Sequence, residues 1–125
     1  MTRWLAALWA MALFALSGCH PAPQPPSFQA TDITGAGFAR DFRLTDHNGR
    51  VRTLADFKGK VVAIFFGYTH CPDVCPTTLS DFAAALKLLG DQAGRVQVIF
   101  VTLDPQRDTP DILKQFVPAF NPAFL

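Results

Sequence analysis

Two strongly apolar runs mark the centre of the domain that this sequence encodes. Residues 61–66 (Val-Val-Ala-Ile-Phe-Phe) are all apolar, and residues 96–103 form a second run rich in valine, isoleucine and phenylalanine. Short runs that are apolar on both faces are typical of buried parallel strands. The two runs and the segment between them predict a right-handed βαβ unit. The apolar positions at helical spacing in that segment, which ends near Gly90, are Leu79, Phe82, Ala83, Leu86 and Leu89.

A β-hairpin is expected before the first apolar run. Residues 42–45 and 51–54 alternate apolar and polar side chains, which is typical of half-exposed strands. Between them, Asn48-Gly49 supplies the positive φ angles of a tight hairpin turn. Two central strands and one hairpin would leave apolar sheet surface uncovered.

A second helix is expected after residue 108. Thr109 as the N-cap, Pro110 at the first position and Asp111 in the first turn form a coherent start signal. Pro118 is expected to end this helix, because proline cannot donate a backbone hydrogen bond. The predicted buried face consists of Ile112, Leu113, Phe116 and Val117.

The N-terminus reads as an export signal. Residues 1–18 carry a single charge, Arg3, and the apolar run over residues 4–16 is too short to span a bilayer comfortably. The small residues before Cys19 resemble the lipobox of bacterial lipoproteins, which implies cleavage before Cys19 and a lipid on its sulfur. The alternatives are an ordinary signal peptide with an incidental cysteine, or an uncleaved anchor. In each case the domain lies outside the cytoplasm, on the periplasmic side of the cell envelope.

Three segments therefore divide the chain. Residues 1–18 are the lipoprotein signal peptide, and residues 19–27 are a proline-rich tether that spaces the domain from the membrane. Residues 28–125 form one small domain. Of its last ten residues, seven are apolar and none is charged, so we expect a domain cut before its final strands.

Composition narrows the possible partners and ligands. Without residues 1–18 the chain has ten basic and ten acidic residues, all of the latter aspartate, and no charge run. A neutral domain of this kind carries no electrostatic footprint for nucleic acid. Both methionines and both tryptophans lie within residues 1–18, so a soft-metal site would have to use cysteine and histidine.

Cys71 and Cys75 are the main candidates for chemistry. They follow the first apolar run and precede a helical pattern, and a helix N-terminus stabilises the thiolate that acts as nucleophile and as metal ligand. Two thiolates suit a soft ion such as Cu(I), with a third ligand, most simply a histidine. A redox dithiol and a structural disulfide are the alternatives. A disulfide that closes so short a loop would add little stability.

Two motifs carry a family resemblance. Residues 66–76 (Phe-Gly-Tyr-Thr-His-Cys-Pro-Asp-Val-Cys-Pro) and residues 103–110 (Leu-Asp-Pro-Gln-Arg-Asp-Thr-Pro) resemble the SCO1/SenC family of membrane-tethered copper proteins. The resemblance implies an α/β, thioredoxin-like fold. In this chain the fold would be partial: an N-terminal β-hairpin plus βαβα, without the C-terminal antiparallel strands and last helix.

The resemblance also implies a function. A copper ion would be bound by Cys71, Cys75 and a distal histidine, and delivered to the binuclear copper site of cytochrome c oxidase. The partner would be the copper-receiving subunit, and thiol reduction at that site is the alternative role. Asp73 matches the first motif and is a candidate for tuning the loop.

In the SCO1/SenC family the ligand histidine lies in a strand well beyond the second helix. The resemblance therefore implies that the third ligand is not in this chain. His70 adjoins Cys71 but is expected to point away from it, since neighbouring strand residues face opposite sides. His47 lies in the hairpin turn, where we expect it to be solvated. His20 lies beside the lipid anchor.

Two further features lie near the motifs. Asp104, Arg107 and Asp108 suggest a catalytic cluster, but we expect a loop braced by an Arg–Asp pair and capped by Thr109. Tyr68 either shields the cysteines or simply packs beside them.

Three functions remain open at this point. The first is a copper chaperone that uses the cysteine pair. The second is a thiol–disulfide oxidoreductase of exported proteins, which needs the same cysteines but no histidine. The third is a truncated product that does neither.

Overall fold

The computed structural model describes residues 29–38 and 40–125. Two compact units divide the chain, Met1–Ala36 and Gly37–Leu125, and each is described by itself. In the first unit, the backbone N–H and the hydroxyl of Thr34 both donate to the Asp32 carboxylate, at 2.8 and 2.6 Å. The predicted signal peptide, the lipidation at Cys19 and the proline-rich tether lie outside the described residues.

A parallel pair of strands forms the centre of the second unit, as the apolar runs predicted. Strand β3 (Val61–Gly67) pairs with β4 (Val96–Thr102), in register from Val61↔Val96 to Gly67↔Thr102. Helix α2 (Val74–Leu89) and the short 3-10 helix η2 (Gly90–Arg95) connect the two strands. Because β3 and β4 run in the same direction, their carboxyl ends, which precede the two sequence motifs, meet at one edge.

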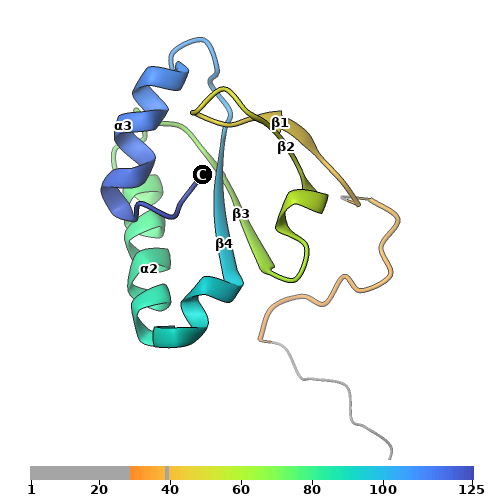
Figure 1. Cartoon of the computed structure of the whole chain (residues 1–125). Helices are drawn as coiled ribbons and strands as arrows, with labels where there is room; N and C mark the ends of the chain where they lie inside the picture. Colours follow the sequence, from red (N-terminus) through yellow and green to blue (C-terminus); the bar gives the residue numbers. More distant parts are fainter. Residues whose placement is uncertain (1–28, 39) are drawn as a thin grey trace, which may run out of the picture. The chain divides into compact units, whose positions relative to one another are not determined.

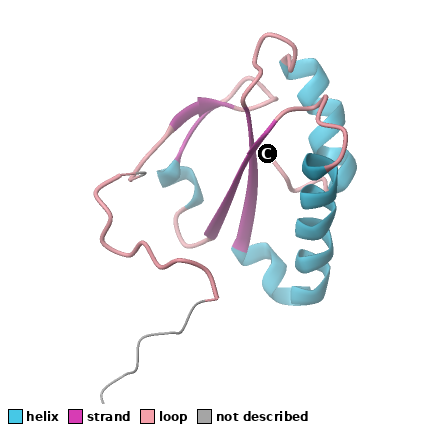
Figure 2. Ribbon diagram, turned by 180° about the vertical axis from the view of Figure 1, so that it is seen from behind, coloured by secondary structure: helices cyan, strands magenta, loops and turns pink. Residues whose placement is uncertain are grey.

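Both long helices cover the same face of the strand pair. Figure 1 shows α2 and α3 (Pro110–Phe120) on one side of β3 and β4 and the hairpin on the other, and Figure 2 shows the same arrangement from behind. Side chains from both helices and from β4 meet there. The buried core cluster consists of Leu79, Leu86, Val98, Phe100, Val117 and Phe124.

The hairpin is confirmed, with a loop held by a carboxylate. Strands β1 (Arg43–Thr45) and β2 (Val51–Thr53) pair antiparallel, and the 3-10 helix η1 (Leu54–Phe57) follows. Asp46 accepts hydrogen bonds from the backbone N–H groups of Asn48 and Arg50, both at 2.9 Å, and from Arg52 Nε at 2.8 Å. Gly49 has a φ of 78°, which favours glycine there.

Helix α3 begins as predicted but does not end at Pro118. Thr109 is the N-cap, and its hydroxyl accepts from the backbone N–H of Ile112 at 3.5 Å. The prediction that Pro118 ends the helix is wrong, since α3 continues to Phe120. A proline in the last turn removes only one helical hydrogen bond, and the edge-on contact between Phe116 and Phe120, with ring centroids 5.2 Å apart, holds this turn together.

The C-terminal residues pack against β4. Phe124 is only 1% exposed. Leu125 donates its backbone N–H to the Val98 carbonyl at 3.2 Å, and its carbonyl accepts from the Phe100 N–H at 2.7 Å. This alternation is the hydrogen-bond pattern of a parallel ladder. Leu125 therefore lies along the edge of β4 that faces away from β3.

Strand β3 is less buried than its sequence predicted. Ile64 is 40% exposed and Phe66 is 59% exposed, whereas residues 97–100 of β4 are all buried. Ala63 and Phe65 pack against the core cluster, so Ile64 and Phe66, which alternate with them along the strand, lie on the opposite face, which lacks cover at these positions. The expectation of uncovered apolar sheet surface is confirmed, and that of a β3 buried on both faces is wrong.

Candidate functional site

The two cysteines lie in the connection between β3 and α2. Cys71 is in the turn after Tyr68, where its backbone N–H donates to the Tyr68 carbonyl at 3.3 Å. Cys75 lies in the first turn of α2, which begins at Val74. The Cys75 side chain is only 5% exposed, whereas Cys71 is half-exposed. The structure therefore places both thiols at the helix N-terminus, one accessible and one buried.

Hydrogen bonds to Cys71 favour its ionised form. The Cys75 side chain contributes most to a lowered pKa of Cys71, and the Cys75 backbone N–H, 3.4 Å from the Cys71 Sγ, follows. The backbone N–H of Asp73 and the Tyr68 side chain lower the pKa of Cys71 further.

The environment of Cys75 has the opposite effect. Burial is the main cause of a raised pKa for the Cys75 thiol, and its hydrogen bond with Cys71 adds to this. The negative charges of Cys71 and Asp108 raise the pKa of Cys75 as well. Both residues are free thiols in this structure. The pair is therefore asymmetric: the accessible thiol has a lowered pKa and the buried thiol a raised one.

Gly67 lets α2 approach the end of β3. A β-carbon at this position would lie 2.8 Å from the Phe100 ring and 3.0 Å from the Cys75 Sγ. The first distance is shorter than side-chain carbons show and the second is unusually tight, so glycine fits this close packing without a shift of its neighbours. The last residue of β3 thus fixes where the buried sulfur lies.

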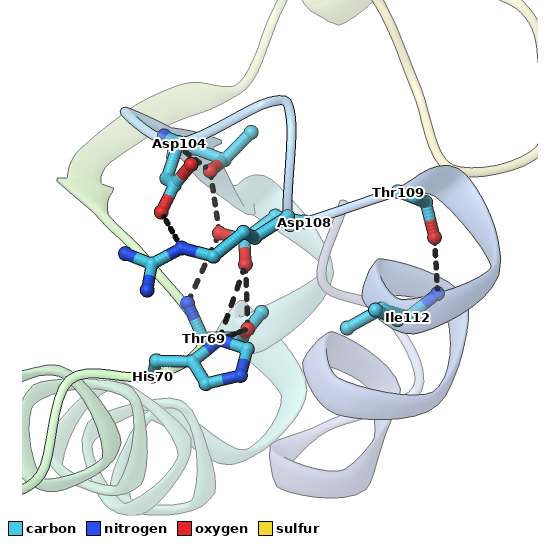
Figure 3. Close-up of polar contacts among 8 residues, drawn as sticks. Thr69, His70, Asp104, Asp108, Thr109 and Ile112 are labelled. Carbon is cyan, nitrogen blue, oxygen red and sulfur yellow. Dashed lines mark hydrogen bonds and ion pairs between the residues drawn. The ribbon is translucent and has the colours of Figure 1, made fainter.

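Asp108 is a residue of this site whose role the sequence did not reveal. It is only 2% exposed and lies in the loop after β4. Its carboxylate accepts from the Thr69 backbone N–H at 3.0 Å, from the Thr69 hydroxyl at 2.5 Å and from the Thr102 hydroxyl at 2.5 Å. Figure 3 shows Asp108 directed at Thr69 and His70. Asp108 therefore joins the two sequence motifs.

These contacts keep Asp108 ionised. Burial alone would raise the pKa of this carboxyl group, but the hydrogen bonds from Thr102 and Thr69 outweigh it, and the pKa is lowered overall. The His70 ring contributes a smaller lowering. The signal for this residue is topological: its loop follows β4, and the carboxyl end of β4 adjoins that of β3.

The rest of the loop is a brace, as expected. Arg107 Nε forms an ion pair with the Asp104 carboxylate. The backbone N–H of Asp104 donates to the Thr102 hydroxyl at 3.0 Å. These contacts, with the Thr109 cap, hold the loop between β4 and α3 in one conformation.

His47 and His70, the two histidines of the described part, do not complete a metal site with the cysteines. His70 Nδ1 lies 3.1 Å from the Thr69 hydroxyl and 3.9 Å from the Asp108 carboxylate, and His70 stays exposed. His47 is half-buried and lines a cavity of about 310 Å³ between the hairpin and β4, so it is less solvated than expected. Among residues 29–38 and 40–125, no three histidine, cysteine or aspartate side chains are grouped closely enough to hold a metal ion.

No helix within the described part of the chain has the length and apolar character needed to cross a membrane.

Known proteins match most of this chain. A family model described as SCO1/SenC matches residues 30–125. The Bos taurus protein SCO2 homolog, mitochondrial, is 45% identical over 87 residues, which are 68% of this chain and 33% of that protein. The chain thus spans about a third of the length of this relative.

Solved structures share the fold. Bradyrhizobium japonicum ScoI with copper bound has a TM-score of 0.62 and 48% identity, over 67% of this chain and 54% of that one. A SCO1/SenC family lipoprotein from Bacillus anthracis has a TM-score of 0.60 and 30% identity, over 67% and 52%. The thioredoxin-like α/β fold is therefore confirmed, and this chain covers about half of each of these structures.

Proposed function

We propose, because this chain belongs to the SCO1/SenC family, that it binds copper through Cys71 and Cys75 and delivers it to another protein. The asymmetric pair of thiols at the start of α2 is the observation that carries this proposal. Copper is bound in the matched Bradyrhizobium japonicum structure, which is 48% identical to this chain. Copper is here the cargo of the protein rather than a cofactor of a reaction.

The donor set fits monovalent copper. Thiolates are soft ligands, and Cu(I) accepts few of them, whereas harder divalent ions favour more nitrogen and oxygen donors. Cys71 and Cys75 would hold the ion with their sulfurs. Among the described residues no three ligand side chains are grouped closely enough to hold a metal ion. A distal histidine, which the family resemblance implies as third ligand, would therefore come from outside them.

The two thiols would play different parts in loading. Cys71 is accessible and its lowered pKa favours the thiolate, so it would meet the incoming ion first. Cys75 is buried with a raised pKa, so it would lose its proton only when the ion arrives. An unfavourable second ionisation weakens copper binding, which favours release to an acceptor with a better donor set.

The place of delivery follows from the N-terminal sequence. We propose that a lipid on Cys19 anchors the chain to a membrane, with the domain on the periplasmic side and residues 19–27 as the tether. The matched Bacillus anthracis family member is a lipoprotein. The acceptor would be the copper-receiving subunit of cytochrome c oxidase, as the family resemblance implies.

A Cu(I) titration tests the copper proposal. The full chain, reduced and held in detergent, is titrated with Cu(I) against a coloured chelator. A matched Cys71→Ser/Cys75→Ser variant serves as the control. We expect one tightly bound copper ion in the wild type and none in the variant. Equal uptake by the two proteins would remove the proposal.

A thiol–disulfide oxidoreductase is the second candidate. An accessible thiol with a lowered pKa beside a buried one is the arrangement of an attacking and a resolving cysteine. In that reaction the Cys71 thiolate attacks a substrate disulfide, and Cys75 then displaces the reduced substrate and forms a Cys71–Cys75 disulfide. If the reduced protein cleaved an exported protein's disulfide no faster than reduced glutathione does, this would count against the role.

A further inference from the structure

The Asp108 carboxylate is a buried charge at the junction of three elements. It lies two residues before α3, and it accepts hydrogen bonds from Thr69 after β3 and from Thr102 at the end of β4. Each of these donors is satisfied, and no buried side-chain nitrogen or oxygen in the described residues lacks a partner. A charge removed from water is retained only where several donors compensate it. This carboxylate is thus a fixed point of the structure.

We propose that Asp108 is a positioning residue for the cysteine site, which it holds in place through Thr69. The inference rests on the proposed copper binding, and it deepens it by adding a residue that touches neither sulfur. Thr69 is bound to Asp108 by both its backbone N–H and its hydroxyl. Two bonds from one residue to one carboxylate fix its backbone as well as its side chain.

The two hydrogen bonds between Thr69 and Asp108 act directly on the turn that carries Cys71. Thr69 lies two residues before Cys71, and the Cys71 N–H in turn donates to the carbonyl of Tyr68. With Thr69 fixed, the turn can place the Cys71 Sγ at the N–H of Cys75. Without it, the turn would gain freedom, and that contact would be made for less of the time.

Asp108 accepts hydrogen bonds from two sides, from Thr69 and from Thr102. Their separate removal distinguishes an effect on the cysteine site from an effect on stability. The bond to Thr69 leads to the cysteine turn. The bond from Thr102 leads to β4 and, through the Thr102 hydroxyl, to the backbone N–H of Asp104. If Asp108 were merely structural, loss of either hydrogen bond would affect the cysteine site equally. If it is a positioning residue, loss of the Thr69 bond affects the site, whereas loss of the Thr102 bond affects only the stability of the fold.

Matched substitutions of the two threonines that donate to Asp108 test the inference. Thr69→Val and Thr102→Val each remove one hydroxyl donor to Asp108 at nearly constant volume. The full chain is reduced, and the rate of Cys71 alkylation by iodoacetamide is measured by mass spectrometry, together with Cu(I) affinity against a chelator and the unfolding midpoint. Asp108→Asn serves as a third variant, and the two valine variants keep the test valid if it fails to fold.

We expect Thr69→Val to slow Cys71 alkylation by about threefold or more and to weaken Cu(I) binding by about tenfold, as for the loss of one hydrogen bond to a charged group. Thr102→Val should leave both within about twofold while it lowers the unfolding midpoint. Asp108→Asn should change both measurements as Thr69→Val does. The Asp108→Asn/Thr69→Val double variant should lose no more Cu(I) affinity or alkylation rate than either single variant. Equal effects of the two valine variants, or no effect of Thr69→Val, would overturn the inference.

The two proposals fail in different ways. If the wild type binds no Cu(I) but the alkylation rates still differ between the valine variants, the copper proposal fails and the positioning role of Asp108 stands. If the wild type binds Cu(I) and the valine variants behave alike, the positioning role fails and the copper proposal stands.

Discussion

The backbone N–H of Cys75 donates a hydrogen bond to the Cys71 Sγ, 3.4 Å away, at the first turn of α2. This contact is one of several that make the pKa values of the two cysteines unequal. Hydrogen bonds to the accessible Cys71 sulfur stabilise its thiolate and lower its pKa, whereas burial disfavours the Cys75 thiolate and raises its pKa. The distinct behaviour of each thiol can be measured without any metal.

Cys71 should react with iodoacetamide at lower pH than Cys75 does. The thiolate is the reactive form, so a lowered pKa shifts the rate profile of Cys71 below that of an ordinary cysteine, and a raised pKa shifts that of Cys75 above it. The profile of Cys71 is measured in Cys75→Ser, which keeps a side-chain donor, and in Cys75→Ala, which removes it. We expect the midpoint to be higher in Cys75→Ala. Identical midpoints would show that the side chain of Cys75 does not stabilise the Cys71 thiolate.

Asp108 should stabilise the fold at neutral pH and lose this effect in acid. Its pKa in the folded chain is below the ordinary aspartate value of 3.8, so the folded state favours the ionised form. The contribution is complete above that value, and it is lost as the pH falls below 3.8 through the folded-state pKa. Asp108→Ala, which leaves three partly buried donors without their acceptor, should cost about 3 kcal/mol at pH 7.

Urea denaturation of both proteins at pH 7 and pH 3 measures this effect. The difference in unfolding free energy between wild type and Asp108→Ala should be smaller at pH 3. Asp111→Ala is a suitable control, because Asp111 is exposed in the first turn of α3. A difference that is equal at the two pH values would show that the charge of Asp108 does not contribute.

Apolar patterning and helix signals in the sequence predicted the main elements. The two apolar runs became β3 and β4, and the helical spacing between them became α2. Thr109 and Pro110 mark the start of α3 because capping depends only on neighbouring residues. The placement of Cys71 and Cys75 at the strand-to-helix turn followed from the same local signals.

Features that depend on tertiary contacts were not predicted. The direction of the Asp108 side chain is set by Thr69 in the turn after β3, 39 positions earlier in the chain. Pro118 is tolerated because Phe116 and Phe120 pack across the last turn of α3. The exposure of Phe66 depends on which elements cover the sheet, and an apolar run carries no information about that.

The cap of α3 should contribute modestly to stability. Thr109→Ala removes the acceptor for the Ile112 N–H, which lies 3.5 Å from the hydroxyl. This distance is long for a hydrogen bond, so the cost should be near the lower end for N-caps, about 0.5–1 kcal/mol. Thr109→Ser keeps the hydroxyl and should cost less. Thermal unfolding followed by circular dichroism compares the two, and an equal loss in both would exclude the cap as the cause.

Replacement of Gly67 by alanine should destabilise the protein more than replacement of Gly94 does. In Gly67→Ala the added carbon would meet the Phe100 ring of β4 and the Cys75 Sγ of α2 at 2.8 and 3.0 Å, so both side chains must shift away from β3. Overpacking of this kind costs about 1–3 kcal/mol. Since the shift moves the buried sulfur, Cu(I) affinity should fall as well.

Gly94→Ala is the matched control for Gly67→Ala. A β-carbon on Gly94 meets nothing within 4 Å. The unfolding free energy of Gly94→Ala should therefore stay within about 0.5 kcal/mol of the wild type. Urea denaturation and Cu(I) competition on the three proteins separate a packing effect from the general effect of replacing a glycine. If Gly67→Ala matched Gly94→Ala in both measurements, the close approach of α2 to β3 would not be what sets the place of Cys75.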